Sequence, residues 1–367
     1  MRPRNQSLDV LRALAVFLTM GIHFPVFATL HRAGWIGVDL FFVLSGYLIS
    51  GLLFQEFHDT GGIRIGRFIL RRGFKIWPPF YALILGTMAL LMVVRVKFSI
   101  AAIALNAFFL QNYFYFDPRF KNLLLYHTWS LAVEEHFYLA LPLLLAGMIL
   151  LAKFTRSSQP FRWIPGISAG VLVLCTILRR YDVFHAPFAA THLNMDFLFA
   201  GVALGYLRHF RFEAFRRMAA WPVIIVVVLC CFPPFVFESN SRWFQFFGVT
   251  LLIIGFTFLV AWAVSRDPAG LFGQRAAEAL ATVGRYSYSI YLWHVMLAKL
   301  LFTVPSPSVW RFLIYVVISI AVGVVASEMI ERPFLVLRKK WFPESSNSAR
   351  SAVPNAISLE SEVVRAN

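Results

Sequence analysis

The sequence predicts an all-α fold: a polytopic membrane helical bundle of about ten transmembrane helices, with both termini in the cytoplasm. Two observations carry this prediction. The chain of 367 residues is 59% hydrophobic and only 14% charged, whereas about a quarter of the residues in a soluble domain are charged. Apolar runs long enough to cross a bilayer also recur along the chain. We expect a transmembrane domain over residues 1–340 and a Ser-rich, disordered cytoplasmic tail over 341–367.

The apolar runs place the spans, and the basic residues between them give the orientation. With the N-terminus inside, the inner segments carry 23 Lys and Arg residues and the outer segments carry nine, as the positive-inside rule expects. The net charge of +16 therefore reflects membrane topology, and we expect no nucleic-acid partner. The predicted spans lie near residues 8–27, 36–56, 76–94, 127–151, 164–180, 191–207, 219–237, 243–264, 286–303 and 310–331.

Two apolar segments do not follow the simple pattern. Residues 99–113 are too short for a comfortable span, so we expect an interfacial or re-entrant piece of an outer loop. The first apolar run imitates a signal peptide, but charged residues interrupt it, so we expect a retained span. The three cysteines lie in apolar runs without the spacing of a disulfide framework or a metal site, and we expect no metal.

The first predicted span carries ionisable side chains on one face. Arg12 and His23 are eleven residues apart, which is about three helical turns plus 20°, so both point the same way at about 16 Å separation. Asp9 lies one turn before Arg12 and can pair with it. A charge inside a membrane costs about 3 kcal/mol or more. This face is therefore a candidate lining of a functional site.

The second span and the loop after it add further polar candidates. Asp39 enters the second span near its outer end, where a carboxylate needs a partner or a role. The small residues within 45–51 permit close helix packing. Before the third span, Arg71, Arg72 and Lys75 belong to a basic cluster. This cluster fits either a positive-inside anchor or a cytoplasmic phosphate site, because Arg recognises phosphate bidentately.

The fourth span opens with a polar stripe along one helical face. The stripe consists of His127, Ser130, Glu134 and Tyr138. Counted from the two sides of the bilayer, His23 and Glu134 lie at a similar depth, about 20 Å above the inner side. A histidine beside a carboxylate is a general-base arrangement. We therefore predict that His23 and Glu134 are catalytic and that the rest of the stripe supports them.

The last two spans supply candidates for the wall of the same site. Tyr291 and His294 share a face of the ninth span with Ser287, although a histidine satisfied within the bundle explains His294 at least as well. Glu331 ends the tenth span at the inner side, where we expect it to hold a basic partner. The spans together outline a tunnel with a cationic inner mouth and a His/Glu pair higher up.

Six strings, in a fixed order, resemble the acyltransferase 3 family of integral membrane acyltransferases. They are LDVLRALAVFLTMGIHF, GVDLFFVLSGYLIS, RRGFKIWPPFY, HTWSLAVEEHFYL, YSYSIYLWHV and ERPF. The resemblance covers the whole chain and implies a ten-helix bundle that moves an acyl group, usually acetyl, from cytoplasmic acyl-CoA. The acceptor it implies is a hydroxyl of a cell-envelope or exported saccharide. It also implies a bacterial inner membrane, and we expect no fused esterase-like domain in this chain.

The resemblance also implies roles for particular residues: it carries the family's first-span Arg and His onto Arg12 and His23, and its basic pair onto Arg72 and Lys75. The mechanism we predict joins this to our interpretation of the residues. The donor phosphates would dock on Arg12, Arg71, Arg72 and Lys75. The thioester would then meet His23, which takes a proton from the acceptor hydroxyl while Glu134 orients the ring. Alternatively, an acyl-enzyme forms with His23 or a nearby hydroxyl as the carrier. The sequence does not separate these two routes.

Two positions depart from the family pattern. The family usually has Arg where Lys75 stands, and lysine keeps the charge but loses the bidentate fork. It usually has Gln where His136 stands. Because His136 lies off the Glu134 face of the helix, we do not expect it to be catalytic.

Two other classes of protein stay open at this point. A transporter of a sugar or an organic anion also uses intramembrane His, Glu and Arg, but it predicts inverted repeats, and no repeat is visible in the sequence. A membrane-bound acyltransferase of the other multi-span type would share the acyl-CoA donor, but the order of motifs fits it less well. The sequence specifies the acceptor only as a saccharide or lipid-linked glycan, and it predicts no oligomeric state.

Overall fold

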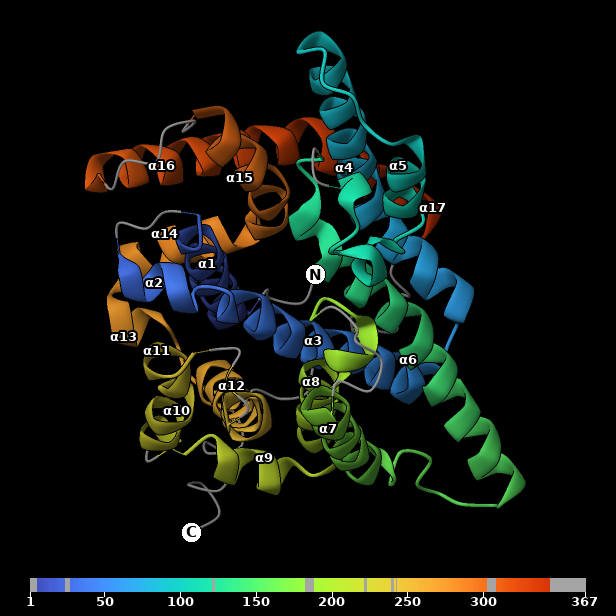
Figure 1. The fold of residues 1–367 in the computed structure, drawn as a ribbon. Coiled ribbons are helices and arrows are strands. Elements are labelled where there is room, and N and C mark those ends of the chain that lie inside the picture. The colour runs from blue at the N-terminus through green and yellow to red at the C-terminus, as the bar shows by residue number, and fades with distance from the viewer. Residues whose placement is uncertain are drawn as a thin grey trace.

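A computed structural model describes residues 5–23, 27–120, 123–181, 188–220, 223–238, 241, 243–301 and 308–343. Across these residues the secondary structure is helical, without a strand, and the helices pack into one bundle (Figure 1). The predicted all-α polytopic fold is confirmed. The predicted tail over 341–367 lies outside the described residues, apart from its first three positions.

The helices follow the predicted spans closely. In the first half of the chain they are α1 (Gln6–Gly21), α2 (Ala28–Ala33), α3 (Ile36–Thr60), α4 (Ile65–Val93), α5 (Ile100–Ala107) and α6 (Trp129–Phe154). Short 3-10 turns between α5 and α6 are η1 (Gln111–Phe114), η2 (Pro118–Phe120) and η3 (Tyr126–Thr128). The second half contains α7 (Ile164–Tyr181), η4 (Thr191–Leu193), α8 (Met195–Phe210), α9 (Phe212–Met218), α10 (Val223–Cys231), α11 (Pro233–Val236), η5 (Phe244–Gly248), α12 (Val249–Val264), α13 (Ala269–Phe272), α14 (Gln274–Arg285), α15 (Ser287–Leu301), α16 (Val309–Ala326), η6 (Ser327–Glu331) and α17 (Arg332–Trp341).

Within the described residues, six helices are long and apolar enough to cross a membrane. They are α3, α4, α6 with η3, α7, α12 with η5, and α16 continued through η6 into α17. The α9 and α10–α11 segments qualify only together, as a pair bent by 68°. The remaining predicted spans correspond to α1, α8 and α15, which contain 16, 16 and 15 residues and are shorter than the about 20 residues of a full crossing. Each of the ten predicted segments therefore contains a helix. Length and apolar composition together identify six or seven of these helices as spans.

The third predicted span starts earlier in the structure than in the sequence prediction. Helix α4 begins at Ile65, eleven residues before position 76. The basic cluster therefore lies on the first turns of α4 and not in a loop. Because the basic cluster lies on a helix, the helical geometry decides which of the cluster's side chains share a face.

The segment 99–113 is not a long helix. It contains α5, which has eight residues, followed by η1. Its side chains Asn106 and Gln111 are buried, and both are hydrogen-bonded to Thr128 at the entrance to α6. A loop whose amides reach into the bundle in this way agrees with the expected re-entrant piece.

Small residues bring α3 and α8 into backbone contact. A Cβ atom on Gly46 would lie 1.9 Å from the carbonyl oxygen of Leu198, and one on Gly201 would lie 2.2 Å from that of Val43. Helices approach this closely only where neither carries a side chain at the contact. The expected packing role of the small residues within 45–51 is therefore confirmed at Gly46.

Replacing Gly201 by valine should destabilise the bundle by about 1–3 kcal/mol or more, because the added side chain would collide with the backbone of α3. The measurement is the thermal midpoint of the purified protein in detergent, followed by size-exclusion chromatography after heating. Gly170→Val is the matched control, since a Cβ atom at Gly170 in α7 meets nothing within 4 Å. Equal midpoints for the two variants would contradict the close approach of α3 and α8.

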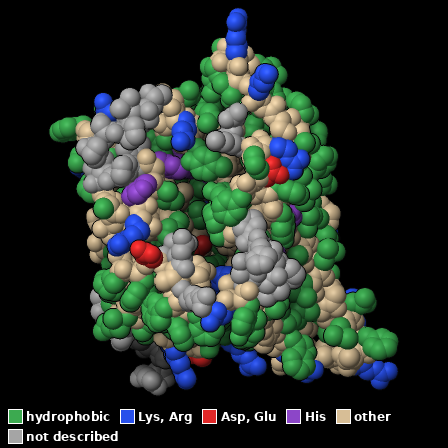
Figure 2. All heavy atoms as spheres, viewed as in Figure 1, with side chains coloured by type: hydrophobic (Ala, Val, Ile, Leu, Met, Phe, Trp, Pro, Cys, Tyr) green, Lys and Arg blue, Asp and Glu red, His purple; other side chains and the backbone are tan. Residues whose placement is uncertain are grey.

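The outer surface of the bundle is apolar. Leu85, Leu143 and Val317, on three spanning helices, are 64%, 58% and 65% exposed. Figure 2 shows hydrophobic side chains over most of the visible face, with Lys and Arg mainly toward its edges. Such a surface suits lipid tails around the spanning helices, with charged groups at the two membrane surfaces.

Candidate active site

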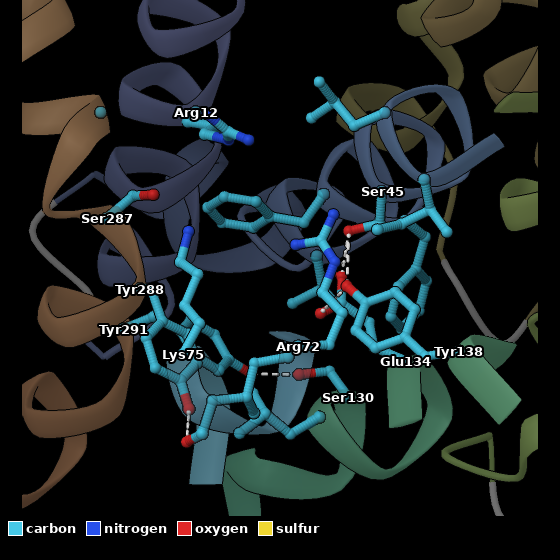
Figure 3. A pocket seen from close by; sticks show the side chains of 18 of the residues that line it. Arg12, Ser45, Arg72, Lys75, Ser130, Glu134, Tyr138, Ser287, Tyr288 and Tyr291 are labelled. Carbon is cyan, nitrogen blue, oxygen red and sulfur yellow. Dashed lines mark hydrogen bonds between the residues drawn. The ribbon is translucent and has the colours of Figure 1, made fainter. Parts of the chain in front are cut away.

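A cavity lies among α1, α3, α4, α6, α14 and α15. Its polar lining consists of Arg12, Ser45, Arg72, Lys75, Ser130, Glu134, Tyr138, Arg285, Ser287, Tyr288 and Tyr291. Figure 3 shows the cationic ends of Arg12, Arg72 and Lys75 directed into this space. Residues that helical spacing placed on shared faces therefore line one cavity in the structure.

Arg12 is paired with Asp9, as predicted. Arg12 Nη1 donates to Asp9 Oδ1 at 2.7 Å, and the two side chains are 24% and 3% exposed. The backbone of Asp9 also touches α14, because a Cβ atom on Gly284 would lie 1.7 Å from the Asp9 carbonyl oxygen. Glycine at this position lets α14 lie directly against α1. The ion pair and this contact hold the Arg12 guanidinium on the cavity wall.

Glu134 lies on the cavity wall among polar side chains of α3, α4 and α6. Its carboxylate accepts hydrogen bonds from Tyr138 Oη at 3.0 Å and from Ser45 Oγ. The guanidinium of Arg72 lies 5.5 Å from the centre of the Tyr138 ring, in the geometry of a cation–π contact. Glu134 and Tyr138 therefore form the surface against which Arg72 is oriented.

The charges that line the cavity are predominantly positive. Arg12, Arg72, Lys75 and Arg285 contribute cations, and Glu134 contributes the carboxylate. Guanidinium and ammonium groups in this number suit a ligand that carries several phosphates. Arg71 is not in this lining: it donates to the Phe342 carbonyl oxygen and so joins α4 to the end of α17. The structure thus separates Arg71 from the predicted phosphate-binding set.

A cluster of rings, which we call the imidazole cluster, adjoins the cavity. It consists of His23, Tyr126, His127, Tyr291 and His294. The ring of His294 lies 5.1 Å from that of His23 and 5.3 Å from that of His127, and His23 lies 6.4 Å from Tyr126. Tyr291 belongs to both sites, because its ring lies 5.3 Å from His294 and its hydroxyl lies 2.7 Å from Ser130 Oγ on the cavity wall.

Three separate segments position the imidazole cluster. His23 follows the last turn of α1, Tyr126 and His127 lie on η3, and Tyr291 and His294 are one turn apart on α15. The Tyr291 hydroxyl donates to the His127 carbonyl oxygen at 2.7 Å, and His127 Nε2 donates to the Leu292 carbonyl oxygen at 3.1 Å. These bonds tie η3 to α15 and leave the rings little freedom.

His23 and Glu134 do not contact each other among the described residues. The recorded neighbours of His23 are Tyr126, whose hydroxyl lies 3.4 Å from His23 Nδ1, and His294. Glu134 is bound to Ser45 and Tyr138 instead. The depth estimate placed the two groups at one level, but depth does not say on which side of the bundle a group lies. Glu134 faces α3 and α4, whereas His23 lies with η3 and α15.

Two other predicted polar residues lie outside the cavity. Asp39 is buried near the ion pair of Arg179 with Asp196, whose closest atoms are 2.5 Å apart, and its Oδ2 has no hydrogen-bond partner in the part of the chain that the structure describes. Glu331 accepts from Ser289 Oγ at 3.2 Å and Ser327 Oγ at 3.0 Å. Among the described residues these hydroxyls replace the basic partner that the sequence led us to expect.

His136 lies apart from the imidazole cluster. Its Nδ1 is 2.6 Å from Thr191 Oγ1 at the start of η4. This agrees with the expectation that it does not share the Glu134 face.

The sequence analysis missed Arg285 and Tyr288 of the cavity lining, and it missed the roles of Ser45 and Tyr126. Ser45 was counted only as a small packing residue, yet its hydroxyl binds Glu134. Tyr126 precedes His127 directly and points its hydroxyl at His23. The only signal for Tyr126 was its position beside a predicted site residue, since a turn residue has no helical face to assign.

The fold and the cavity define a class of protein: a polytopic helical membrane protein whose cationic cavity adjoins a cluster of imidazoles. A family model described as an acyltransferase domain matches residues 5–328. The chain therefore belongs to the acyltransferase 3 family. This assignment favours acyl transfer over the transporter alternative.

Curated relatives agree with this family. The chain is 30% identical over 315 residues to a Staphylococcus aureus (strain COL) protein named provisionally as an O-acetyltransferase, covering 78% of the chain and 50% of the relative. It is 26% identical over 357 residues to the peptidoglycan O-acetyltransferase OatA of Listeria monocytogenes serovar 1/2a, covering 92% of the chain and 56% of that protein. The O-acetyltransferase OatA of Staphylococcus aureus (strain NCTC 8325 / PS 47) is also 26% identical, with 92% and 57% covered.

The chain thus spans about half the length of the curated relatives it matches. No solved structure matches it significantly. The comparisons therefore establish the family, and the proposals for the reaction, its donor and acceptor and its catalytic residues depend on the geometry of the site.

Proposed function

We propose that the protein transfers an acetyl group from cytoplasmic acetyl-CoA to a hydroxyl of a cell-envelope saccharide, within a bacterial inner membrane. The proposal rests on one observation: the cavity lined by Arg12, Arg72 and Lys75 adjoins, through Tyr291, the imidazole cluster that contains His23. The cations suit the phosphates of coenzyme A. The cluster offers a base for the acceptor hydroxyl.

On the donor side, the phosphates would bind to the cations of α1 and α4. Arg72 offers a planar fork for two phosphate oxygens, whereas Lys75 offers a single point charge. Glu134 and Tyr138 would keep the Arg72 fork facing the cavity. In this proposal Glu134 supports donor binding, and the role of orienting His23 belongs to other groups. The narrow pantetheine arm would then extend along α15 past Tyr291.

In the transfer step, His23 would act on the acceptor hydroxyl. As the hydroxyl oxygen attacks the thioester carbon, an imidazole nitrogen of His23 takes its proton and the carbon–sulfur bond breaks. A second route, in which His23 first carries the acetyl group and then passes it on, uses the same residue as a nucleophile. Tyr126 is the group placed to hold the His23 ring, because its hydroxyl is within reach of Nδ1.

We propose a saccharide as the acceptor because of the relatives' names. One of them is named for peptidoglycan O-acetylation, and a glycan hydroxyl is a nucleophile of the kind that His23 could activate. The acceptor would reach His23 from the side of the bundle where η3 lies. By the predicted topology this is the outer side, opposite to the donor.

The test is a reconstituted transfer reaction. The purified protein in nanodiscs is mixed with acetyl-CoA labelled in the acetyl group and with soluble peptidoglycan fragments. We expect label on the glycan that mild alkali removes as acetate, together with an equal amount of free coenzyme A thiol. Absence of both label and thiol release would contradict the proposed donor. Thiol release without labelled glycan would contradict the proposed acceptor and leave the donor assignment standing.

A further inference from the structure

His294 is a buried imidazole with one nitrogen that has no partner among the described residues. The side chain is 0% exposed, and its Nδ1 lies 2.5 Å from the Tyr291 carbonyl oxygen. Because a carbonyl only accepts hydrogen bonds, Nδ1 carries the hydrogen of the neutral ring and Nε2 keeps its lone pair. This Nε2 is buried and makes no hydrogen bond to any residue that the structure describes. The Tyr291 carbonyl thus holds His294 in the tautomer of a proton acceptor.

Nearly all buried polar atoms in native proteins have a partner, and two nitrogens of the imidazole cluster lack one among the described residues: His294 Nε2 and His127 Nδ1. The neighbours of His294 are the rings of His23, His127 and Tyr291, at 5.1, 5.3 and 5.3 Å. At a centroid distance of 5.1 Å, two imidazoles can bring facing nitrogens to hydrogen-bond distance by a small ring rotation. The free lone pair of His294 is therefore within reach of His23.

His294 also contacts the side of the site that would receive the donor. Tyr291 precedes it by one turn of α15 and lines the cavity, whereas His23 is in contact with Tyr126 of η3. The ring of His294 thus touches both a residue of the donor cavity and the proposed base. In an acetyl transfer the proton leaves the acceptor oxygen on one side and is needed by the leaving sulfur on the other.

Resting on the proposed function, we infer that His294 is a second catalytic residue, which passes the acceptor's proton from His23 to the leaving sulfur. The acceptor O–H bond breaks as His23 gains the proton and the new carbon–oxygen bond forms, which gives a tetrahedral intermediate. His23 then gives up a ring N–H proton to His294 Nε2. His294 donates this proton to the sulfur as the carbon–sulfur bond breaks, so that both imidazoles return to the neutral state and one thiol is released per ester formed.

The inference predicts a dependence on the leaving group that a purely structural histidine would not show. The sulfur of coenzyme A is basic and takes up a proton as it leaves, whereas 4-nitrothiophenolate is a weak base that leaves without one. Thiol release is measured with acetyl-CoA and with S-(4-nitrophenyl) thioacetate, both in the presence of peptidoglycan fragments. His294→Gln should lower the rate with acetyl-CoA by about 100-fold or more and leave the rate with the nitrophenyl thioester within about threefold of wild type.

Control variants separate the proposed roles. His294→Asn can keep an amide donor near the Tyr291 carbonyl but also lacks a basic nitrogen, so it should show the same dependence on the leaving group. His23→Gln should lose activity with both donors, because the first proton acceptor is gone. His136→Gln, a half-buried histidine control outside the imidazole cluster, should match wild type with both. Thermal midpoints in detergent report the folding of each variant.

Each other outcome overturns the inference. Equal losses with the two donors in the His294 variants would indicate a structural role. Full activity of these variants with acetyl-CoA would indicate that His294 has no part in the transfer. Failure of the proposed function looks different: wild-type protein would then release no thiol from acetyl-CoA at all.

Discussion

Replacing His23 by glutamine should lower acetyl transfer by about 10²–10⁴-fold, the usual contribution of a positioned general base. Glutamine is close to histidine in volume and can still hydrogen-bond Tyr126, but it neither accepts the acceptor's proton nor carries an acyl group. Both routes considered for the transfer therefore fail in this variant. The measurement is the rate at which label from acetyl-CoA appears on peptidoglycan fragments, at saturating donor.

The variant must be compared with a histidine that has no place in the site. His58, near the end of α3, is suited to this comparison because its side chain is 77% exposed. His58→Gln should transfer acetyl groups at the wild-type rate. The KM for acetyl-CoA should remain near the wild-type value in His23→Gln, because the cavity cations are untouched. Wild-type transfer by His23→Gln would remove this residue from the mechanism.

Features that depend on one helix could be predicted from the sequence. The spacing of Asp9 and Arg12 predicted an ion pair that forms at 2.7 Å. The stripe on the fourth span was also predicted, and Ser130, Glu134 and Tyr138 do line one cavity. Helical periodicity is enough for such features, because side chains three, four or seven residues apart lie on one face whatever the rest of the fold does.

Features that depend on the meeting of distant helices could not be predicted. His23 and Glu134 were expected to touch because both lie at a similar depth, but depth does not distinguish the α3 side of the bundle from the α15 side. The partner of Arg71 could not be predicted for the same reason. Arg71 adjoins Arg72 in sequence, but on a helix their side chains point in directions about 100° apart. Only the packing of α17 against α4 shows that Arg71 turns to the Phe342 carbonyl.

Local exceptions to helix geometry also escaped prediction. The cluster of basic residues was assigned to the loop before the third span. In the structure α4 begins at Ile65 and runs through Pro78 and Pro79, although proline usually stands in the first turn of a helix. Tyr126 lies on a 3-10 turn, where no periodic pattern identifies the direction of a side chain. These are the places where tertiary contacts decide the backbone.

Replacing Arg72 by glutamine should raise the KM for acetyl-CoA by about 10- to 150-fold, because a hydrogen bond to a charged group contributes about 1.5–3 kcal/mol. Arg72 lines the cavity over the Tyr138 ring, and Glu134 accepts the Tyr138 hydroxyl beside it. The expected partner of its fork is a donor phosphate. Arg72→Lys should recover part of the affinity, since lysine keeps the charge but cannot bind two oxygens in one plane.

Acetyl-pantetheine provides the decisive comparison, since it carries the thioester and lacks the nucleotide phosphates. If Arg72 binds phosphate, its loss should change the KM for acetyl-CoA and leave the slower reaction of acetyl-pantetheine unaffected. Arg67→Gln on the same helix is the control, because Arg67 donates to the Pro343 carbonyl oxygen and does not line the cavity. Equal losses with both donors would instead assign Arg72 to the folding of the cavity or to the chemistry of the thioester, and the phosphates would need another partner among Arg12, Lys75 and Arg285.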